Sequence, residues 1–252
     1  MAIDIKNVSK SFKQKNDTKL QVLDNIDLYI EDKEFVCLLG QSGCGKTTLL
    51  RIIAGLDDSD TGEVTDGTGV VKGPSKDRGF IFQQYSLFPW MTVLDNVLFG
   101  LNIARPDQKE ENIEYAKSYL KSVGLEEFID SYPHQLSGGM KQRVAIVRTL
   151  LNHTPVQLMD EPFSALDVLT RHNLQEQLIG VWKKFGTTIV FVTHDVDEAV
   201  YLADKIVIMD RDPGKIKEIF EVDMERPRKR ESAEFIELEE KIIDILGVRT
   251  ME

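Results

Sequence analysis

Apolar and polar side chains alternate along residues 3–8 and again along residues 22–30. A period of two places one face of a strand in the core and the other in solvent, so both segments predict half-buried strands. The charged residues 13–19 lie between them and predict a turn. The chain is therefore expected to begin with two strands joined by a charged turn.

The pattern then changes at residues 35–39, which form a short, wholly apolar run that stops at Gly40. Such a run is typical of a strand buried on both faces of a parallel sheet. A helix is expected from Lys46, and further strands are predicted at 79–83, 156–160, 188–193, 205–209 and 216–222. Because helical stretches lie between several of these strands, their order favours an α/β fold.

Residues 85–153 instead carry apolar positions at helical spacing, without a convincing strand. This texture predicts a helical subdomain within one domain that spans residues 1–252. A basic turn and a helix are expected at about 225–247. Because an acidic helix follows the basic residues 226–230, they favour a solvated turn over a lipid or nucleic-acid contact.

Charge and composition narrow the classes of function. The 42 acidic residues exceed the 31 basic ones, and a net charge of -11 repels phosphodiester backbones, so no nucleic-acid partner is expected. No apolar run approaches the roughly 18 residues that span a bilayer, and no signal pattern opens the chain. Cys37 and Cys44 flank a glycine-rich turn, a poor arrangement for a disulfide, so a cytoplasmic location is expected.

The segment that follows the apolar run matches the phosphate-loop pattern G-x-x-x-x-G-K-[ST] between a strand and a helix. Its glycines let successive amides point at phosphate oxygens, Lys46 would reach the β- and γ-phosphates, and the Thr47 hydroxyl would ligate Mg²⁺. A tight turn without a ligand is the structural alternative. The predicted ATP-binding residues are Gly40, Gln41, Ser42, Gly43, Cys44, Gly45, Lys46, Thr47 and Thr48.

Two adjacent carboxylates, Asp160 and Glu161, end a predicted strand. Successive strand residues point in opposite directions, so the two side chains can do different work at the carboxyl end of the sheet. One can hold Mg²⁺ through water, and the other can polarise an attacking water as general base. Beside a phosphate loop, this pair favours nucleotide hydrolysis over an ordinary solvated loop.

Residues 136–143, Leu-Ser-Gly-Gly-Met-Lys-Gln-Arg, resemble the signature motif of the ATP-binding-cassette (ABC) ATPases. Other family elements follow in the expected order. Gln83 matches the Q-loop glutamine, residues 164–167 match the D-loop, and His194 matches the switch histidine. Phe12 matches the aromatic residue that stacks on adenine, where the family more often has tyrosine.

The resemblance implies a fold with a RecA-like mixed sheet as the P-loop NTPase core, an N-terminal antiparallel β subdomain and an inserted helical subdomain. It also implies a head-to-tail dimer, of identical chains or with a similar ATPase. In that dimer Ser137, Gly138 and Gly139 at the start of a helix form an anion site for the ATP of the other chain.

The same resemblance assigns a role to each matched residue. Glu161 is implied as general base, His194 as a contact of the γ-phosphate, and Asp167 as the residue that orients the partner's half. The catalytic residues are then Glu161, His194, Gln83 and Lys46. The metal ligands are Thr47, Gln83 and Asp160.

Residues 83–93 contain more aromatic and Met side chains than so short a segment can bury, which favours a docking surface for a permease helix. The side chains concerned are Tyr85, Leu87, Phe88, Trp90 and Met91; packing within the helical subdomain is the alternative. The Phe-Pro-Trp sequence and the ending Glu225-Arg226-Pro227-Arg228 resemble importer ATPases for nitrate, sulfonate, taurine and bicarbonate.

The expected protein is therefore the ATPase subunit of an importer for a small anion, held at the inner face of the membrane by separate permease subunits. An extracytoplasmic substrate-binding protein would be an indirect partner. An exporter ATPase, a non-transport ABC ATPase and a nucleotide-gated binding module are the alternatives.

Overall fold

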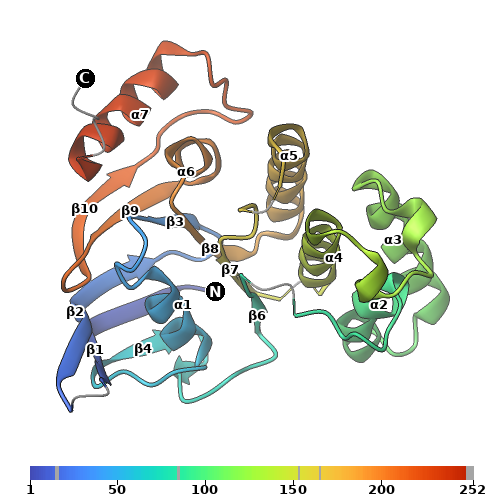
Figure 1. Cartoon of the computed structure of the whole chain (residues 1–252), viewed down its shortest axis with the longest axis horizontal. Helices are drawn as coiled ribbons and strands as arrows, with labels where there is room; N and C mark the ends of the chain where they lie inside the picture. Colours follow the sequence, from blue (N-terminus) through green and yellow to red (C-terminus); the bar gives the residue numbers. More distant parts are fainter. Residues whose placement is uncertain (15–16, 84–85, 153, 165, 248–252) are drawn as a thin grey trace. The chain divides into compact units, whose positions relative to one another are not determined.

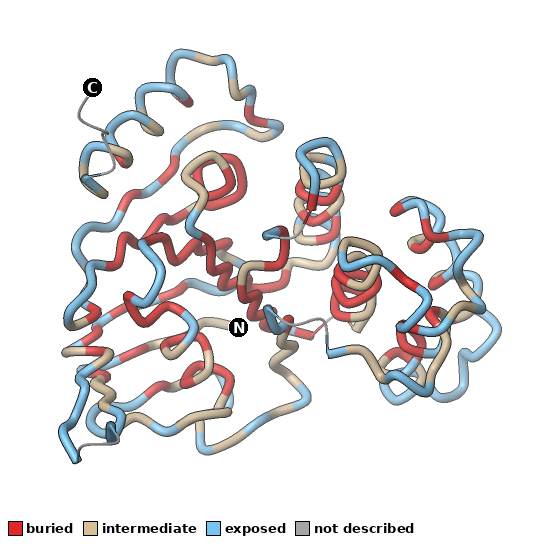
Figure 2. The backbone as a smooth tube through the Cα atoms, in the orientation of Figure 1, coloured by how far each residue is buried: buried red, intermediate tan, exposed pale blue. Residues whose placement is uncertain are grey.

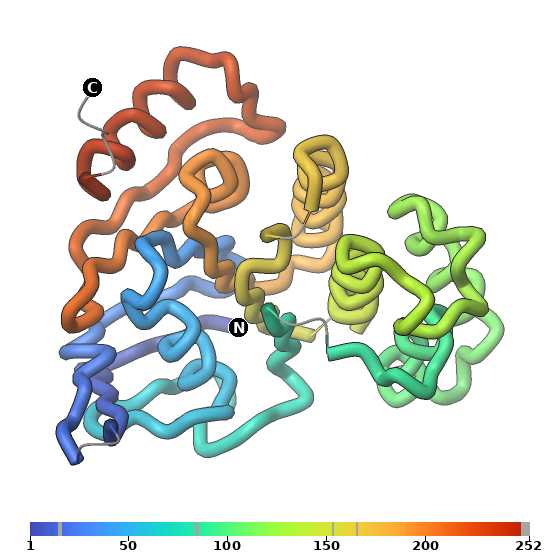
Figure 3. The backbone as a smooth tube through the Cα atoms, viewed as in Figure 1, coloured from blue at the N-terminus to red at the C-terminus, as the bar shows by residue number. Residues whose placement is uncertain are grey.

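The computed structural model describes residues 1–14, 17–83, 86–152, 154–164 and 166–247. The chain divides into two compact units. Unit 1 combines residues 1–78 with residues 188–252, and unit 2 is residues 79–187. In Figure 3 the blue N-terminal strands of unit 1 accordingly lie beside its orange C-terminal strands. The phosphate-loop segment and the predicted acidic strand thus belong to different units.

An antiparallel sheet in unit 1 contains both N-terminal strands in the order β2-β1-β4-β5 (Figure 1). Its strands are β1 (Ile3–Lys13), β2 (Lys19–Ile30), β4 (Thr61–Asp66) and β5 (Gly69–Val70). The alternation along β1 and β2 is confirmed, with Ile3, Ile5 and Val8 buried. The sequence did not predict β4, because Val64 is its one buried side chain and the rest of the strand is polar.

The second sheet of unit 1 is mixed and surrounds the apolar run. Its strands are β3 (Phe35–Leu39), β8 (Thr188–Thr193), β9 (Lys205–Asp210) and β10 (Lys215–Glu221). β3 lies between β8 and β9 and is parallel to both, whereas β10 is antiparallel to β9. Every residue of β3 and β8 is buried, as Figure 2 shows in red. The expected doubly buried strand is therefore confirmed.

Three helices cover this unit: α1 (Lys46–Ala54), α6 (Val196–Leu202) and α7 (Ala233–Leu246). α6 packs on β3, and α7 packs on α6. The expectation of a solvated basic turn before α7 is wrong, because Arg228 is only 6% exposed and Arg226 and Arg230 form ion pairs with acidic residues of this unit. The charge of the segment alone could not show that buried main-chain carbonyl groups accept hydrogen bonds from its arginines.

Unit 2 contains most of the helices. Its elements are β6 (Arg78–Ile81, whose first residue belongs to unit 1), α2 (Val93–Ala104), α3 (Lys109–Ser122), the 3₁₀ turns η1 (Glu126–Phe128) and η2 (Pro133–Gln135), α4 (Gly138–Leu151), β7 (Val156–Asp160) and α5 (Val168–Phe185). β6 and β7 are neighbouring strands, and α2, α3 and α4 pack on one another. The helices of the predicted subdomain at 85–153 all lie in this unit; His153, its last residue, lies outside the described residues.

The mixed sheet, the antiparallel N-terminal sheet and the intervening helices confirm the predicted α/β class. Within the described part of the chain, no helix has both the length and the apolar character needed to cross a bilayer.

Candidate functional site

The phosphate-loop segment in unit 1 joins β3 to α1 through a turn whose glycines have left-handed backbone angles. Gly43 has a φ of 83° and Gly45, the N-cap of α1, has a φ of 95°. A Cβ at Gly45 would lie 2.6 Å from Cδ2 of Leu23 and 2.9 Å from the carbonyl oxygen of Val22. Only glycine fits there. Since Gly45 has no side chain to cap α1, the first amides of that helix stay accessible to an anion.

Lys46 places a cation inside this turn. Its side chain is 5% exposed, and Nζ donates hydrogen bonds to the carbonyl oxygens of Gly40 at 2.6 Å and Gln41 at 3.0 Å. The Cys44 sulfur lies 3.7 Å from the same ammonium group. The rest of the predicted rim is more open: Gln41, Ser42, Gly43 and Thr47 are exposed and Thr48 is half-buried. A buried cation below exposed amides and hydroxyl groups fits a polyphosphate.

The turn between β9 and β10 packs against the phosphate-loop segment. The Gly214 N–H donates to the Val22 carbonyl at 3.0 Å, and the Gly214 carbonyl accepts from the Asp24 N–H at 2.9 Å. A Cβ at Gly214 would lie 2.3 Å from the Cys44 carbonyl oxygen. Gly214 was not among the predicted site residues. Its one local signal, the Pro213-Gly214 pair, indicates a turn but not what the turn touches.

His194 and Phe12 also lie in unit 1, and both are exposed. His194 sits between β8 and α6, where the Asp195 N–H donates to Thr193 Oγ1 at 3.0 Å and Thr193 Oγ1 donates to Glu198 Oε2 at 2.6 Å. The turn that carries the histidine is thus tied at both sides. Phe12 lies near the end of β1 with the Lys10 ammonium 5.5 Å from its ring centroid.

The two carboxylates end β7 in unit 2, as expected. Asp160 is 4% exposed, whereas Glu161 is half-buried and has a φ of 45°. A left-handed backbone is strained for a residue other than glycine and is enriched at functional sites. The Glu161 carbonyl oxygen accepts from Ser164 Oγ at 3.0 Å. At the end of β7, Asp160 is therefore buried and Glu161 is partly open to solvent.

The signature segment opens α4. Ser137 is the N-cap, and its Oγ accepts from the Met140 N–H at 3.3 Å. Gly138 and Gly139 begin the helix. Further along, the buried Gln142 donates through Nε2 to the Pro162 carbonyl, and to the Glu161 carbonyl at 3.5 Å. The structure thereby joins the signature helix to the acidic strand end.

Gln142 is a second functional residue that was not predicted, because the signature motif that contains it gives it no role of its own. Its burial and its partners come from a segment some twenty residues away, so no local pattern could show them. Gln83 follows β6 and is exposed. Asp167 caps α5 by accepting from the Thr170 N–H at 3.0 Å, and this hydrogen bond holds the pKa of Asp167 below its usual range. Ala165 of the predicted D-loop lies outside the described residues.

The predicted residues thus form two groups. The phosphate loop, Phe12 and His194 belong to unit 1; Gln83, the signature segment, the acidic pair and Asp167 belong to unit 2. The two groups differ in chemistry. Unit 1 offers a cation and open amides for phosphates, and unit 2 offers carboxylates and a second open helix start.

Comparison with known proteins agrees with these motifs. A family model described as ABC transporter matches residues 23–164. An uncharacterized ABC transporter ATP-binding protein of Methanocaldococcus jannaschii is 54% identical over 97% of this chain and 91% of its own length. An aliphatic sulfonates import ATP-binding protein of Bacillus cereus is 47% identical over 96% and 95%, and a nitrate import ATP-binding protein of Synechocystis is 44% identical over 100% and 97%.

Solved structures show the same likeness. The dimeric structure of an ATP-binding cassette in a post-hydrolysis state, bound to ADP and Pi, has a TM-score of 0.79 and 34% identity. It covers 88% of this chain and 100% of the other.

Proposed function

The chain belongs to the ABC transporter family of ATPases, and we propose that it is the ATP-hydrolysing subunit of an importer for a small anion such as nitrate, sulfonate, taurine or bicarbonate. One observation carries this proposal. Two import ATP-binding proteins, named for sulfonates and for nitrate, resemble the chain over nearly its whole length. The residue roles that follow are parts of the same proposal.

ATP would bind at the phosphate loop of unit 1. The accessible amides at the start of α1 and the buried Lys46 ammonium suit the β- and γ-phosphates, because hydrogen bonds to charged groups are strong where water is partly excluded. The exposed Phe12 ring is available to stack on adenine. Lys46 would exchange its two carbonyl partners for phosphate oxygens when the nucleotide enters.

Mg²⁺ would be held by Thr47, Gln83 and Asp160, with Asp160 acting through water. Hydroxyl, amide and carboxylate oxygens are the hard ligands that Mg²⁺ takes together with substrate phosphates. When bound, the ion neutralises charge on the β- and γ-phosphates.

Glu161 would act as the general base. Glu161 is half-buried and has a strained, left-handed backbone at the end of β7. Its carboxylate would accept a proton from the attacking water. Gln83 would orient that water. His194 would donate a hydrogen bond to a γ-phosphate oxygen and so stabilise its negative charge in the transition state.

The signature segment would act on the ATP of a second chain. Ser137 and the amides that follow it form an anion site without a cation, and the similar cassette was solved as a dimer. The partner would be an identical chain or a similar ATPase, with Asp167 at the junction. Hydrolysis would then require two chains, each completing the other's site.

The permease would dock on the segment before α2. The Trp90 ring is 70% exposed, and the Phe88 ring centroid lies 5.7 Å from that of Trp90 and 4.7 Å from that of Phe99. Asn96 fixes this segment, since its side chain accepts from the Phe88 N–H at 2.8 Å and donates to the Met91 carbonyl at 3.1 Å. Tyr85, also predicted to contact the permease, lies outside the described residues.

The hydrolytic role is tested by Glu161→Gln, with Glu127→Gln as a matched exposed control. Loss of the base should lower turnover by at least about a hundredfold while MgATP binding persists. The bound nucleotide should then accumulate a dimer on size-exclusion chromatography. Wild-type turnover in Glu161→Gln would remove Glu161 as the base.

The importer role is tested in proteoliposomes that contain the chain and the permease that copurifies with it, with the substrate-binding protein added outside. With ATP inside the vesicles, labelled nitrate or an alkanesulfonate should accumulate inside. Trp90→Ala should abolish this uptake by preventing assembly, whereas Tyr29→Ala, which removes an exposed aromatic side chain from β2, should not. Extrusion of the anion instead of uptake would overturn the importer proposal.

A further inference from the structure

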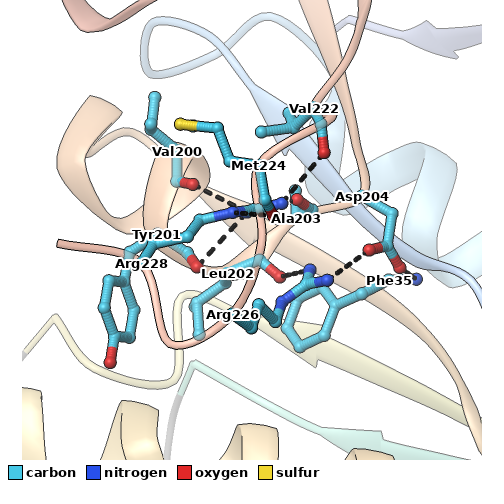
Figure 4. A network of polar contacts seen from close by, with 10 residues as sticks. All are labelled: Phe35, Val200, Tyr201, Leu202, Ala203, Asp204, Val222, Met224, Arg226 and Arg228. Carbon is cyan, nitrogen blue, oxygen red and sulfur yellow. Dashed lines mark hydrogen bonds and ion pairs between the residues drawn. The ribbon is translucent and has the colours of Figure 1, made fainter. Parts of the chain in front are cut away.

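Three arginines between β10 and α7 surround the short helix α6, as Figure 4 shows for two of them, Arg226 and Arg228. They belong to the basic segment 226–230 that the sequence singles out. α6 has seven residues and begins two residues after His194. The arginine contacts and the histidine therefore share one small structural element within unit 1.

Arg228 makes the densest set of contacts. Its Nη1 donates to the carbonyl oxygens of Val200 at 2.8 Å, Tyr201 at 3.3 Å and Ala203 at 2.6 Å, which are the unpaired carbonyls at the end of α6. Nη2 and Nε donate to the carbonyls of Val222 at 3.0 Å and Met224 at 3.3 Å. One side chain thus joins the end of α6 to the chain that leaves β10.

The charge of Arg228 is retained in spite of its burial. Desolvation, and next the positive charge of Arg226, lower the pKa of Arg228 to about 10. The guanidinium group is therefore protonated at neutral pH, and it points its donors at the negative end of the α6 dipole. A lysine could keep this charge but not the forked set of hydrogen bonds.

The flanking arginines hold the same helix from its sides. Arg230 Nε donates to both carboxylate oxygens of Asp197, at 2.8 and 3.0 Å, and its guanidinium carbon lies 3.8 Å from the Tyr201 ring centroid. Arg226 donates to the Leu202 carbonyl at 2.6 Å and to Asp204 at 2.5 Å. All of these partners belong to unit 1.

The other end of α6 is fixed around His194. Asp195 caps the helix by accepting from the Glu198 N–H at 3.4 Å, and the buried Glu198 accepts from Thr193 Oγ1. A rotation or slide of so short a helix would therefore move the turn that carries His194. Arg228 determines where the far end of that helix sits.

We propose that Arg228 is a positioning residue for ATP hydrolysis, which holds α6 so that the His194 side chain reaches the γ-phosphate. The inference rests on the proposed role of His194. It assigns to the basic segment 226–230 a mechanical task in catalysis, distinct from contact with lipid, nucleic acid or substrate. The basic segment 226–230 then controls the rate of ATP hydrolysis without contacting ATP.

The test measures MgATP turnover and binding in the assembled complex for Arg228→Gln and Arg228→Lys, each alone and combined with His194→Ala. Arg228→Gln should lower kcat about tenfold with KM within about twofold, because binding uses the phosphate loop and only the transition state uses His194. Arg228→Lys should recover part of the loss.

The combined variants separate positioning from general weakening. If Arg228 acts through His194, adding either Arg228 substitution to His194→Ala should lower kcat no further. The matched control is Lys217→Gln, which removes a 2.8 Å hydrogen bond from Lys217 Nζ to the Ile245 carbonyl on α7 and leaves α6 untouched. It should keep wild-type kcat.

Unchanged kcat in Arg228→Gln, or losses that multiply with His194→Ala, would overturn the inference. Should Arg228→Gln fail to fold, the same two outcomes are decided with Arg228→Lys. A wild-type rate in His194→Ala itself would instead remove the proposed role of the histidine, which distinguishes the two failures.

Discussion

Two glycine-containing turns each lead into a helix in this molecule, and they are built in opposite ways. The phosphate loop leads from β3 into α1 through Gly43 and Gly45, both with left-handed backbones, and it encloses the buried Lys46. The signature turn leads into α4 through Ser137 with no left-handed glycine and no buried cation. Both expose a helix start, yet only the first encloses a buried ammonium group.

This difference separates two tasks. A buried ammonium with a rigid backbone binds phosphates within one chain, because it supplies charge and geometry at once. A capped helix start with a serine offers weaker, purely dipolar attraction, which suffices only for phosphates already held elsewhere. In the proposed dimer the phosphate loop would therefore set affinity for ATP, and the signature turn would set the rate by completing the site of the other chain.

The largest expected effect is that of Lys46→Ala. Removing the cation should weaken MgATP binding by the isolated chain about a hundredfold, or about 2.7 kcal/mol, as calorimetry would show. The control is Lys141→Ala, a half-buried lysine in the first turn of α4, which should change binding less than about twofold. Equal losses in both variants would end the distinction between the turns.

A second comparison concerns the glycines. Gly45→Ala should lower the free energy of unfolding by about 2 kcal/mol, because it forces alanine into a left-handed backbone against Leu23 and Val22. Gly139→Ala sits in ordinary helical backbone and should change it by less than about 1 kcal/mol, on the stabilising side. Urea unfolding curves measure both. A larger loss in Gly139→Ala would contradict the contrast.

The smallest effect is expected for Ser137→Ala. Turnover in the assembled complex should fall about tenfold while MgATP binding to the isolated chain is unchanged, since the hydroxyl would act on the ATP of the other chain. Ser232→Ala is matched, because Ser232 caps α7 by accepting from the Phe235 N–H at 3.4 Å, so it loses a cap without affecting the site. If Ser232→Ala slowed turnover equally, cap loss rather than phosphate contact would be the cause.

The sequence predicted elements whose signal is local. The apolar run at Phe35–Leu39 predicted a doubly buried strand, and its abrupt end at glycine preceded the phosphate loop. The strand Thr61–Asp66 gave no such signal, because Val64 is its one buried side chain and pairing with β1 forms the rest of the strand.

The residues that escaped prediction act through partners distant in the chain. Arg228 finds three of its carbonyl partners more than twenty residues away, Gln142 finds Pro162, and Gly214 is required by the proximity of the Cys44 carbonyl. Neither the periodicity nor the composition of the sequence shows contacts between residues so distant in the chain. The individual roles assigned to His194, Gln83 and Asp167 stay predictions, since they concern a bound nucleotide and a second chain.

The placement of β3 between β8 and β9 bears on how the protein is made. Both neighbours of the strand that leads into the phosphate loop come from beyond residue 187, whereas the strand itself ends at Leu39. A chain emerging from the ribosome therefore exposes an apolar strand with two open edges until residues 188–210 have been synthesised. It follows that the nascent nucleotide site is an aggregation hazard, and that chaperones acting on the growing chain would have this segment to shield.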